Sequence, residues 1–290
     1  MAKQNYARTF GQDLMRGEHV VGAKGGAESE PTFGAFGEDL AVPQSGTSIF
    51  DPVLTELSYR WFCPPAGHIL DPFAGGSVRG LVASCLGFEY TGVELRGAQV
   101  AANQAQAHIG TGPAPIWHEG DSRHIAEIAP PPADSGGYDM VFSCPPYADL
   151  EVYSDDPADL STLPYEEFLP AYRDIIAATC ALLREDRFAV FVVGDVRDRK
   201  GNYYGFPGHT IDAFRAAGLH LYNEAVLVTA AGSLPIRAGK QFRSGRKMGK
   251  THQNILCFVK GDGKRAAAAC NAASSAANDN DPAAENAAGE

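Results

Sequence analysis

The sequence contains 290 residues and carries a formal net charge of −11 at pH 7. This length is enough to bury a full core within one domain, and the negative charge excludes a uniformly basic surface that would coat nucleic acid. The cysteines form no CxxC pair and the histidines have no metal-ligand spacing, so neither a metal site nor a disulfide framework is expected. No apolar run reaches the ~20 residues of a membrane span. The first residues lack the apolar core of a signal peptide, and we expect a cytoplasmic protein.

Composition divides the chain into three parts. Residues 1–46 are rich in Gly, Ser, Thr and Pro without sustained periodicity, which predicts a flexible N-terminal arm. Residues 47–262 have alternating apolar segments and are predicted to form the globular domain. Ala, Asn, Ser and acidic residues dominate residues 263–290, which predicts a disordered C-terminal tail.

Apolar patterning predicts strands and helices that alternate along the globular part. Helices are predicted over residues 54–62, 77–86, 99–107, 165–184 and 210–217, and strands over residues 69–71, 88–94, 115–118, 138–142, 187–195, 222–229 and 254–260. The strand at 187–195 is almost entirely apolar, as expected of a parallel strand covered on both faces. The alternation predicts a doubly wound, mostly parallel α/β sheet.

Four successive predicted strands end in residues that can carry chemistry. They end at Asp71, Glu94, Asp121 and the segment Ser143–Tyr147. Ligands of doubly wound sheets bind at the carboxyl ends of the strands. These residues are therefore the first candidates for a functional site.

The first of these strands runs through Asp71-Pro-Phe-Ala-Gly-Gly76 into a predicted helix. A glycine turn before a helix N-terminus brings the backbone close to a ligand and presents free N–H groups. The segment is neither a phosphate-binding Walker loop nor the three-glycine dinucleotide fingerprint. Glu94, 23 residues beyond Asp71, is placed to accept hydrogen bonds from two ribose hydroxyls, or is simply a solvated carboxylate. Asp121 is a candidate acceptor for an adenine amino group.

The segment Ser143-Cys-Pro-Pro-Tyr147 is the sharpest feature of the sequence. Pro145 and Pro146 cannot continue a sheet ladder, so they predict a rigid turn whose carbonyls remain free to accept hydrogen bonds. Tyr147 offers a flat face for a nucleobase. Acceptors around an exocyclic amine help its nitrogen to attack a methyl donor. The alternative is a plain strand-terminating turn with a core tyrosine.

These two motifs resemble those of class I S-adenosylmethionine-dependent methyltransferases, specifically the DNA methyltransferases that act on exocyclic amino groups. The segment Ser48-Ile-Phe-Asp-Pro-Val-Leu54, with Pro64-Pro-Ala-Gly67, is similar to an additional donor-pocket segment of that family. The resemblance covers roughly residues 46–260. It implies a Rossmann-like methyltransferase fold, S-adenosylmethionine as cofactor, DNA as partner, and a flipped target base held by the Pro145 carbonyl and Tyr147. The predicted cofactor-binding residues are Phe50, Asp71, Phe73, Gly75, Glu94 and Asp121.

Cys144 departs from the family pattern, in which Asp, Asn or Ser precedes the two prolines. A thiol is a weak hydrogen-bond acceptor, so the Pro145 carbonyl or Ser143 would have to serve the amine. Alternatively, Cys144 is a nucleophile, as in enzymes that methylate carbon 5 of cytosine through a covalent adduct. No Glu-Asn-Val segment accompanies it, which argues against the covalent mechanism.

Two charge clusters flank the later strands. Residues 149–167 contain seven acids and no base, which indicates a solvated segment or a lid over the site. The predicted loop at residues 232–250 is basic and punctuated by glycines, which indicates phosphate contacts or, alternatively, a solubilising loop. Its candidate DNA-binding residues are Arg237, Lys240, Arg243, Arg246 and Lys247. Arg197, Arg199 and Lys200 are candidates for extending this basic face.

The sequence therefore predicts a DNA methyltransferase that acts on N4 of cytosine or N6 of adenine by a single in-line displacement. One alternative keeps the fold and donor but methylates RNA or a protein glutamine. Another is a non-catalytic binding protein in which Cys144 marks a lost activity.

Overall fold

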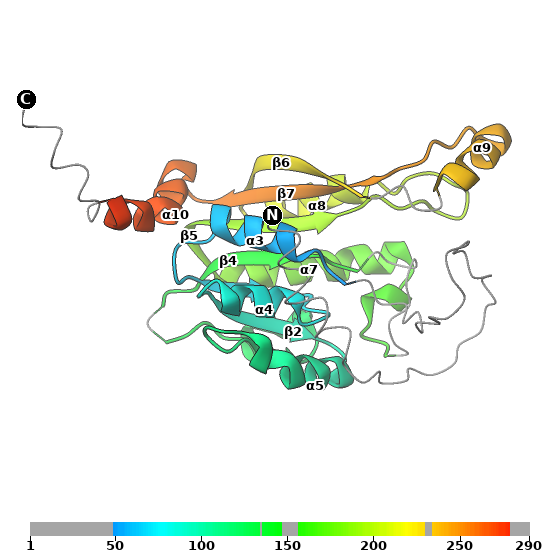
Figure 1. Ribbon diagram of the computed structural model, residues 1–290. Helices are drawn as coiled ribbons and strands as arrows, with labels where there is room; N and C mark the ends of the chain where they lie inside the picture. The colour runs from blue at the N-terminus through cyan, green and yellow to red at the C-terminus, as the bar shows by residue number, and fades with distance from the viewer. Residues whose placement is uncertain (1–48, 134, 147–155, 230–233, 279–290) are drawn as a thin grey trace, which may run out of the picture. The chain divides into compact units, whose positions relative to one another are not determined.

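The computed structural model describes residues 49–133, 135–146, 156–229 and 234–278, in two units (Figure 1). The described part of the larger unit comprises residues 50–229 and 251–278, apart from the gaps just given. The smaller unit contributes Ile49 and residues 234–250. The predicted N-terminal arm at 1–46 lies outside the described residues.

The larger unit contains a seven-stranded sheet with the strand order β3-β2-β1-β4-β5-β7-β6. The strands are β1 (His68–Asp71), β2 (Glu89–Glu94), β3 (Ile116–Glu119), β4 (Tyr138–Ser143), β5 (Leu183–Val193), β6 (His220–Val228) and β7 (His252–Lys260). Strands β1 to β5 are parallel, and β7 is antiparallel to both β5 and β6. The predicted doubly wound, mostly parallel α/β fold is confirmed.

Helices cover both faces of this sheet (Figure 1). Helices α3, α4 and α10 pack together, and α6, α7 and α8 form the other layer. The helices of the larger unit are α3 (Pro52–Phe62), α4 (Val78–Cys85), α5 (Gly97–Gln106), α6 (Ile125–Ile128), α7 (Tyr165–Leu182), α8 (Phe206–Ala216) and α10 (Gly263–Asn278). Helix α3 begins where Asp51 accepts hydrogen bonds from the N–H groups of Val53 and Leu54, with Pro52 as the first helical residue.

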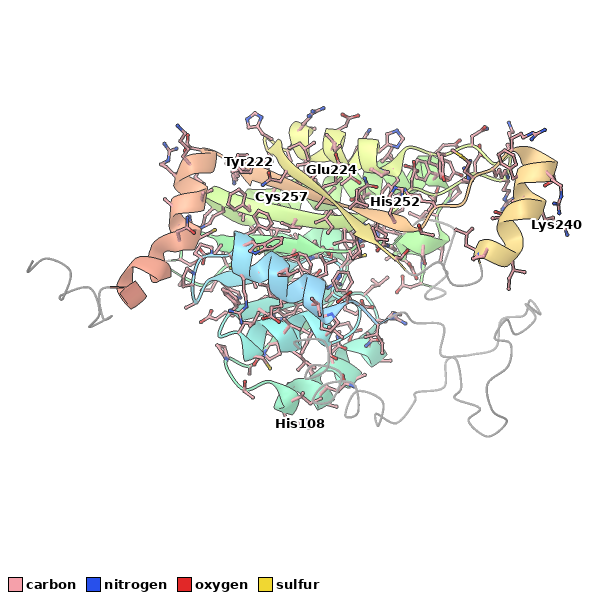
Figure 2. All side chains as sticks on the ribbon, turned by 45° about the horizontal axis from the view of Figure 1, so that its top comes forward. His108, Tyr222, Glu224, Lys240, His252 and Cys257 are labelled. Carbon is pink, nitrogen blue, oxygen red and sulfur yellow. The ribbon has the colours of Figure 1, made fainter. Side chains whose placement is uncertain are left out.

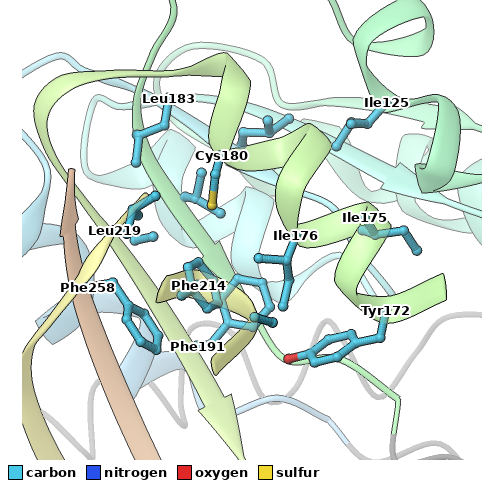
Figure 3. Close-up of a cluster of buried hydrophobic side chains, with 14 of the residues drawn as sticks. Ile125, Tyr172, Ile175, Ile176, Cys180, Leu183, Phe191, Phe214, Leu219 and Phe258 are labelled. Atoms are coloured by element: carbon cyan, nitrogen blue, oxygen red, sulfur yellow. The ribbon is translucent and has the colours of Figure 1, made fainter. Parts of the chain in front are cut away.

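The main hydrophobic core lies between the sheet and the layer of α7 and α8. Residues 188–193 of β5 are fully or almost fully buried. Figure 3 shows Phe191 of β5, Phe214 of α8 and Phe258 of β7 close together, with ring centroids 4.8 Å apart for Phe191–Phe214 and 4.0 Å apart for Phe214–Phe258. This packing holds the carboxyl ends of the central strands in a rigid frame.

Two segments differ from the sequence prediction. Of the tail predicted to be disordered over residues 263–290, residues 263–278 form α10, because alanine has the highest helix propensity and Asp262 caps the first turn by accepting from the N–H groups of Lys264 and Arg265. Residues 279–290 lie outside the described residues. Arg265 also pairs with Asp186 at 2.5 Å, and Ala266 is fully buried. The basic segment predicted as a loop forms α9 (Leu234–Gly245) in the smaller unit.

None of the helices among the described residues is long and apolar enough to cross a membrane. The same residues contain no group of three or more His, Cys, Asp or Glu side chains arranged to hold a metal ion.

Candidate functional site

The turn that follows β1 is built around the buried carboxylate of Asp71. Its Oδ1 accepts from the hydroxyl of Ser143 at 2.6 Å and from the Phe73 N–H at 3.1 Å. Its Oδ2 accepts from the hydroxyl of Tyr90 at 2.8 Å and faces Nε of Arg79 at 2.7 Å. The Asp71 side chain is 0% exposed. Through these contacts it joins β1, β2, β4 and α4. Its carboxylate is fully buried and hydrogen-bonded within the protein.

Arg79 of α4 holds the same turn from the other side. Its guanidinium donates to the carbonyl oxygens of Phe73 and Ala74, the latter at 2.8 Å, and lies 4.8 Å from the centroid of the Phe50 ring. Burial alone would lower the pKa of Arg79, but the charge of Asp71 raises it above its ordinary value. Burial and the same carboxylate raise the pKa of Tyr90. At neutral pH Arg79 is therefore charged and Tyr90 is neutral.

The glycine turn is closed by Glu94 at the end of β2. Gly75 has φ of +52°, a conformation in which an L side chain is strained. Its N–H donates to Oε2 of Glu94 at 3.0 Å, and Oε1 accepts from the backbone N–H and Nε of Arg96. The Glu94 side chain is 12% exposed. Like Asp71 it contacts the turn, but part of the Glu94 side chain remains exposed.

Two side chains of helix α5 form hydrogen bonds with the glycine turn. Nδ2 of Asn103 donates to the Gly75 carbonyl at 2.8 Å, and the Ser77 hydroxyl donates to Oε1 of Gln106 at 2.5 Å. No side-chain hydrogen bond caps the N-terminus of α4 among the described residues. A Cβ built at Gly76 would meet no described atom within 4 Å. Open space beside an uncapped helix N-terminus, with an acid at the next strand end, fits a nucleoside bearing a carboxylate.

Asp121 begins the short helix after β3. Partial burial alone would raise its pKa, but hydrogen bonds from the side chain and backbone of Arg123 lower the pKa below its ordinary value. The nearest of these contacts joins Oδ2 of Asp121 to Nη2 of Arg123 at 2.5 Å. The next residue, Ser122, donates from its hydroxyl to the Pro72 carbonyl at 2.5 Å. The loop after β3 is thereby attached to the turn after β1.

The proline turn follows β4 at the same edge of the sheet. The Ser143 hydroxyl is fully buried and donates to Asp71 of the first turn. Cys144 and Pro146 are half-buried and Pro145 is buried. Tyr147 lies outside the described residues, as do residues 149–155 of the predicted acidic lid.

Two predicted donor-contact residues pack on opposite sides of this region. The ring of Phe50 lies edge-on to Phe142 of β4, with centroids 5.8 Å apart. Phe73 lies 6.1 Å from Tyr172 of α7 and 6.5 Å from Phe191, again between ring centroids. Both rings are half-buried, which leaves part of each accessible to a ligand.

The predicted DNA-contact residues lie in the smaller unit. Lys240 and Arg243 are exposed on α9, and Figure 2 shows Lys240 projecting from that helix. Arg246 follows the helix with its guanidinium 5.2 Å from the ring centroid of Phe242, and Lys247 is half-buried. Arg237 also lies on α9.

Sequence reasoning missed Arg79, Tyr90, Asn103 and Gln106. Only Arg79 carried a local signal, because it is a lone charge in the apolar run Val78–Leu86. Such a charge on a buried helix face requires a partner. The other three are ordinary residues in their own elements and become part of the site through contacts distant in sequence.

No protein-family model matches the chain, and no curated protein matches it. Solved structures with a similar fold include TrmN from Thermus thermophilus, at 15% identity and a TM-score of 0.47 over 72% of this chain and 48% of that one. Magnesium protoporphyrin IX methyltransferase from Synechocystis, solved with bound SAM, has 14% identity and a TM-score of 0.44 over 72% of this chain and 76% of its own. A SAM-dependent methyltransferase from Methanosarcina mazei has 10% identity and a TM-score of 0.46 over 73% and 98%.

The chain therefore spans about half the length of TrmN. S-adenosylmethionine is named for the latter two neighbours. Identities and scores of this size describe a similarity of fold and assign no substrate.

Proposed function

We propose that this protein is an S-adenosylmethionine-dependent DNA methyltransferase that methylates an exocyclic base amine, N4 of cytosine or N6 of adenine. The observation that carries the proposal is the 2.6 Å hydrogen bond from Ser143 to Asp71. It ties the start of the proline turn after β4 to the glycine turn after β1. A donor and an acceptor bound at these two turns would meet at one edge of the sheet.

The glycine turn supplies the donor side of the proposal. S-adenosylmethionine, when bound, supplies an electrophilic methyl group on its sulfonium. Glu94 would accept hydrogen bonds from the ribose hydroxyls, and the uncapped N-terminus of α4 would face the carboxylate of the methionine part. Phe50 and Phe73 would pack against the apolar surface of the donor. Asp71 and Arg79 would hold the turn in place without touching the donor.

The proline turn supplies the acceptor side. The Pro145 carbonyl would accept a hydrogen bond from the target amine, and Tyr147 would stack on the flipped base. This orients the nitrogen lone pair along the line of methyl transfer, so catalysis arises from positioning. Because the Ser143 side chain is fully buried, the acceptors nearest the amine would be the Pro145 carbonyl and the weak thiol acceptor of Cys144.

The basic residues of α9 supply the proposed DNA contacts. Lys240 and Arg243 are exposed there, and an exposed basic helix is suited to the phosphate backbone. Neutralisation of phosphates by such a local cluster is compatible with a net charge of −11 for the whole chain.

The test is mass spectrometry of nucleosides from the DNA of cells that express the protein, with Tyr147→Ala as the control. N4-methylcytosine or N6-methyladenine present with the wild type and absent with the variant is the expected result. Isothermal titration with S-adenosylmethionine checks that both proteins bind the donor and that the variant is folded.

Other outcomes would redirect the proposal. C5-methylcytosine would make Cys144 a nucleophile and overturn the single-displacement mechanism. Unmodified DNA together with donor binding would favour an RNA or protein-glutamine substrate. Unmodified DNA without donor binding would favour a non-catalytic protein.

A further inference from the structure

A short hairpin extends from the same edge of the sheet as the proline turn. It spans residues 195–205, between β5 and α8. Strands β4 and β5 are neighbours, with Ser143 in register with Phe191, so β5 ends beside the start of the proline turn. The hairpin begins two residues after Val193, the last residue of β5.

Backbone hydrogen bonds make this hairpin rigid. Arg197 and Tyr203 form an antiparallel bridge, and the Tyr204 N–H donates to the Val196 carbonyl at 3.0 Å. At the turn, the Asp198 N–H donates to the Asn202 carbonyl at 2.8 Å. A segment ordered in this way loses little conformational entropy when it binds a partner.

The acidic and basic side chains of the hairpin are separated. Asp195 Oδ1 accepts from the N–H groups of Val196, Gly205 and Phe206 at 3.0, 3.0 and 3.1 Å. Asp198 Oδ1 accepts from the Asn202 N–H at 2.8 Å, and that backbone hydrogen bond lowers the pKa of Asp198. Both carboxylates therefore serve the hairpin's own backbone.

Arg197 also serves the hairpin's backbone, because its Nη1 donates to the Gly201 carbonyl at 2.7 Å, whereas the two bases at the turn are directed outwards. Arg199 and Lys200 are exposed at the turn, and no ion pair found among the described residues involves either of them. The Arg197 guanidinium lies 3.6 Å from the centroid of the Tyr203 ring, which is 43% exposed. The tip of the hairpin thus presents the two cations Arg199 and Lys200 beside the guanidinium–ring pair of Arg197 and Tyr203.

A row of aromatic rings anchors the hairpin to the donor turn. Tyr204 stacks on Tyr165 of α7 at 3.8 Å between centroids and 10° between planes. Tyr165 stacks on Phe168 at 5.7 Å, Phe168 on Tyr172 at 5.4 Å, and Tyr172 lies 6.1 Å from Phe73. The hairpin is therefore held in place relative to the glycine turn.

We propose that this hairpin contacts the DNA backbone beside the target base, with Arg199 and Lys200 binding phosphates and the Arg197–Tyr203 pair packing against an adjacent sugar or base. The inference rests on the proposed function and adds a second contact element, located in the sheet-bearing unit, to the basic helix α9. Lysine and arginine next to an exposed aromatic ring form the combination that binds a nucleic-acid strand without reading its sequence.

The test compares two double variants that each remove two positive charges. Arg199→Ala/Lys200→Ala alters the hairpin tip. Arg215→Ala/Lys264→Ala is the matched control, because both residues are exposed and lie towards the opposite edge of the sheet. Arg215 lies in the last turn of α8, which runs back from the hairpin. Lys264 follows β7, whose last residue pairs with Arg187 near the start of β5. Fluorescence anisotropy with a labelled duplex measures Kd over a series of salt concentrations.

Each phosphate contact contributes about 0.9 to the slope of log K against log salt, so the hairpin variant should lose about 1.8 of slope. Counterion release alone then predicts binding up to about 60-fold weaker near 0.1 M salt. The control variant should retain the wild-type slope. The KM for S-adenosylmethionine should stay at the wild-type value in both, because neither pair contacts the donor turn.

Equal slopes for the hairpin and control variants, with wild-type protein that binds and methylates DNA, would overturn this inference and leave the proposed function standing. Wild-type protein that neither binds nor methylates DNA would overturn both. Hairpin-dependent binding of an RNA strand, with no binding of DNA, would overturn the assignment to DNA.

Discussion

Replacement of Arg79 by methionine tests the view that the buried Asp71–Arg79 pair organises the site. Methionine preserves an unbranched side chain with good helix propensity, so the change removes the charge and the donors with little loss of packing. The Arg79 side chain is 5% exposed, its Nε lies 2.7 Å from Asp71, and its Nη2 serves the carbonyls of Phe73 and Ala74. Loss of one partner from a buried pair costs about 3–5 kcal/mol because the other charge is left unpaired.

This cost is large compared with a total stability of about 5–15 kcal/mol. With an m-value of roughly 2–3 kcal/mol per molar urea, the midpoint of unfolding should fall by about 1–2 M. The assay is urea unfolding followed by circular dichroism. Arg60→Met is the control, because Arg60 also pairs with a carboxylate, Glu56 at 2.8 Å, but is 57% exposed. An exposed i,i+4 pair of this kind contributes about 0.3–0.5 kcal/mol.

A second variant separates the unpaired charge from the lost contacts. Asp71→Asn/Arg79→Met removes both charges and should be more stable than Arg79→Met alone, since no carboxylate is left buried without a counter-charge. If Arg79→Met unfolds at the same urea concentration as Arg60→Met, the buried pair does not hold the turn and the reasoning is refuted.

Three further predictions concern the donor, the acceptor and pH. Glu94→Gln should weaken S-adenosylmethionine binding about tenfold or more in isothermal titration, since a charge-assisted hydrogen bond contributes about 1.5–3 kcal/mol; unchanged affinity would exclude Glu94 as a donor contact. Cys144→Ser should retain DNA amino methylation in a radiolabelled-methyl assay, because the proposed mechanism needs no nucleophile; complete loss in a variant that still binds the donor would contradict it. Asp121 has a pKa lowered from 3.8, so its stabilising contribution is full above the unfolded pKa and is lost as pH falls through the lower folded pKa. The stability difference between wild type and Asp121→Asn should therefore be constant above about pH 5 and shrink below about pH 4, whereas a difference independent of pH would show that the Arg123 contacts do not act through the charge.

The alternation of apolar segments was sufficient to predict the sheet. The run from Phe188 to Val193 is uninterrupted by polar residues, which is typical of a strand covered on both faces. Helix α10 was missed because its Asn and Ser residues obscured a run of alanines, and its capping residue lies just before that run. Helix α9 was interpreted as a loop because glycines at 239 and 245 carry a local penalty in a helix interior.

The sequence by itself determined that Asp71, Glu94 and Ser143 end three neighbouring strands, and so that these residues gather at one edge of the sheet, whereas β3 ends at Glu119, two residues before the predicted Asp121. This follows because parallel strands place their carboxyl ends together, whatever the details of packing. Tertiary structure alone decided which of those acids faces inwards. Asp71 and Glu94 look equivalent as acids at strand ends, but Asp71 meets Arg79, Tyr90 and Ser143, which come from three other elements. The donors around Asp71 hold its carboxylate inside the protein, whereas Glu94 contacts the glycine turn with part of its side chain exposed. Only contacts between residues distant in sequence distinguish the two acids.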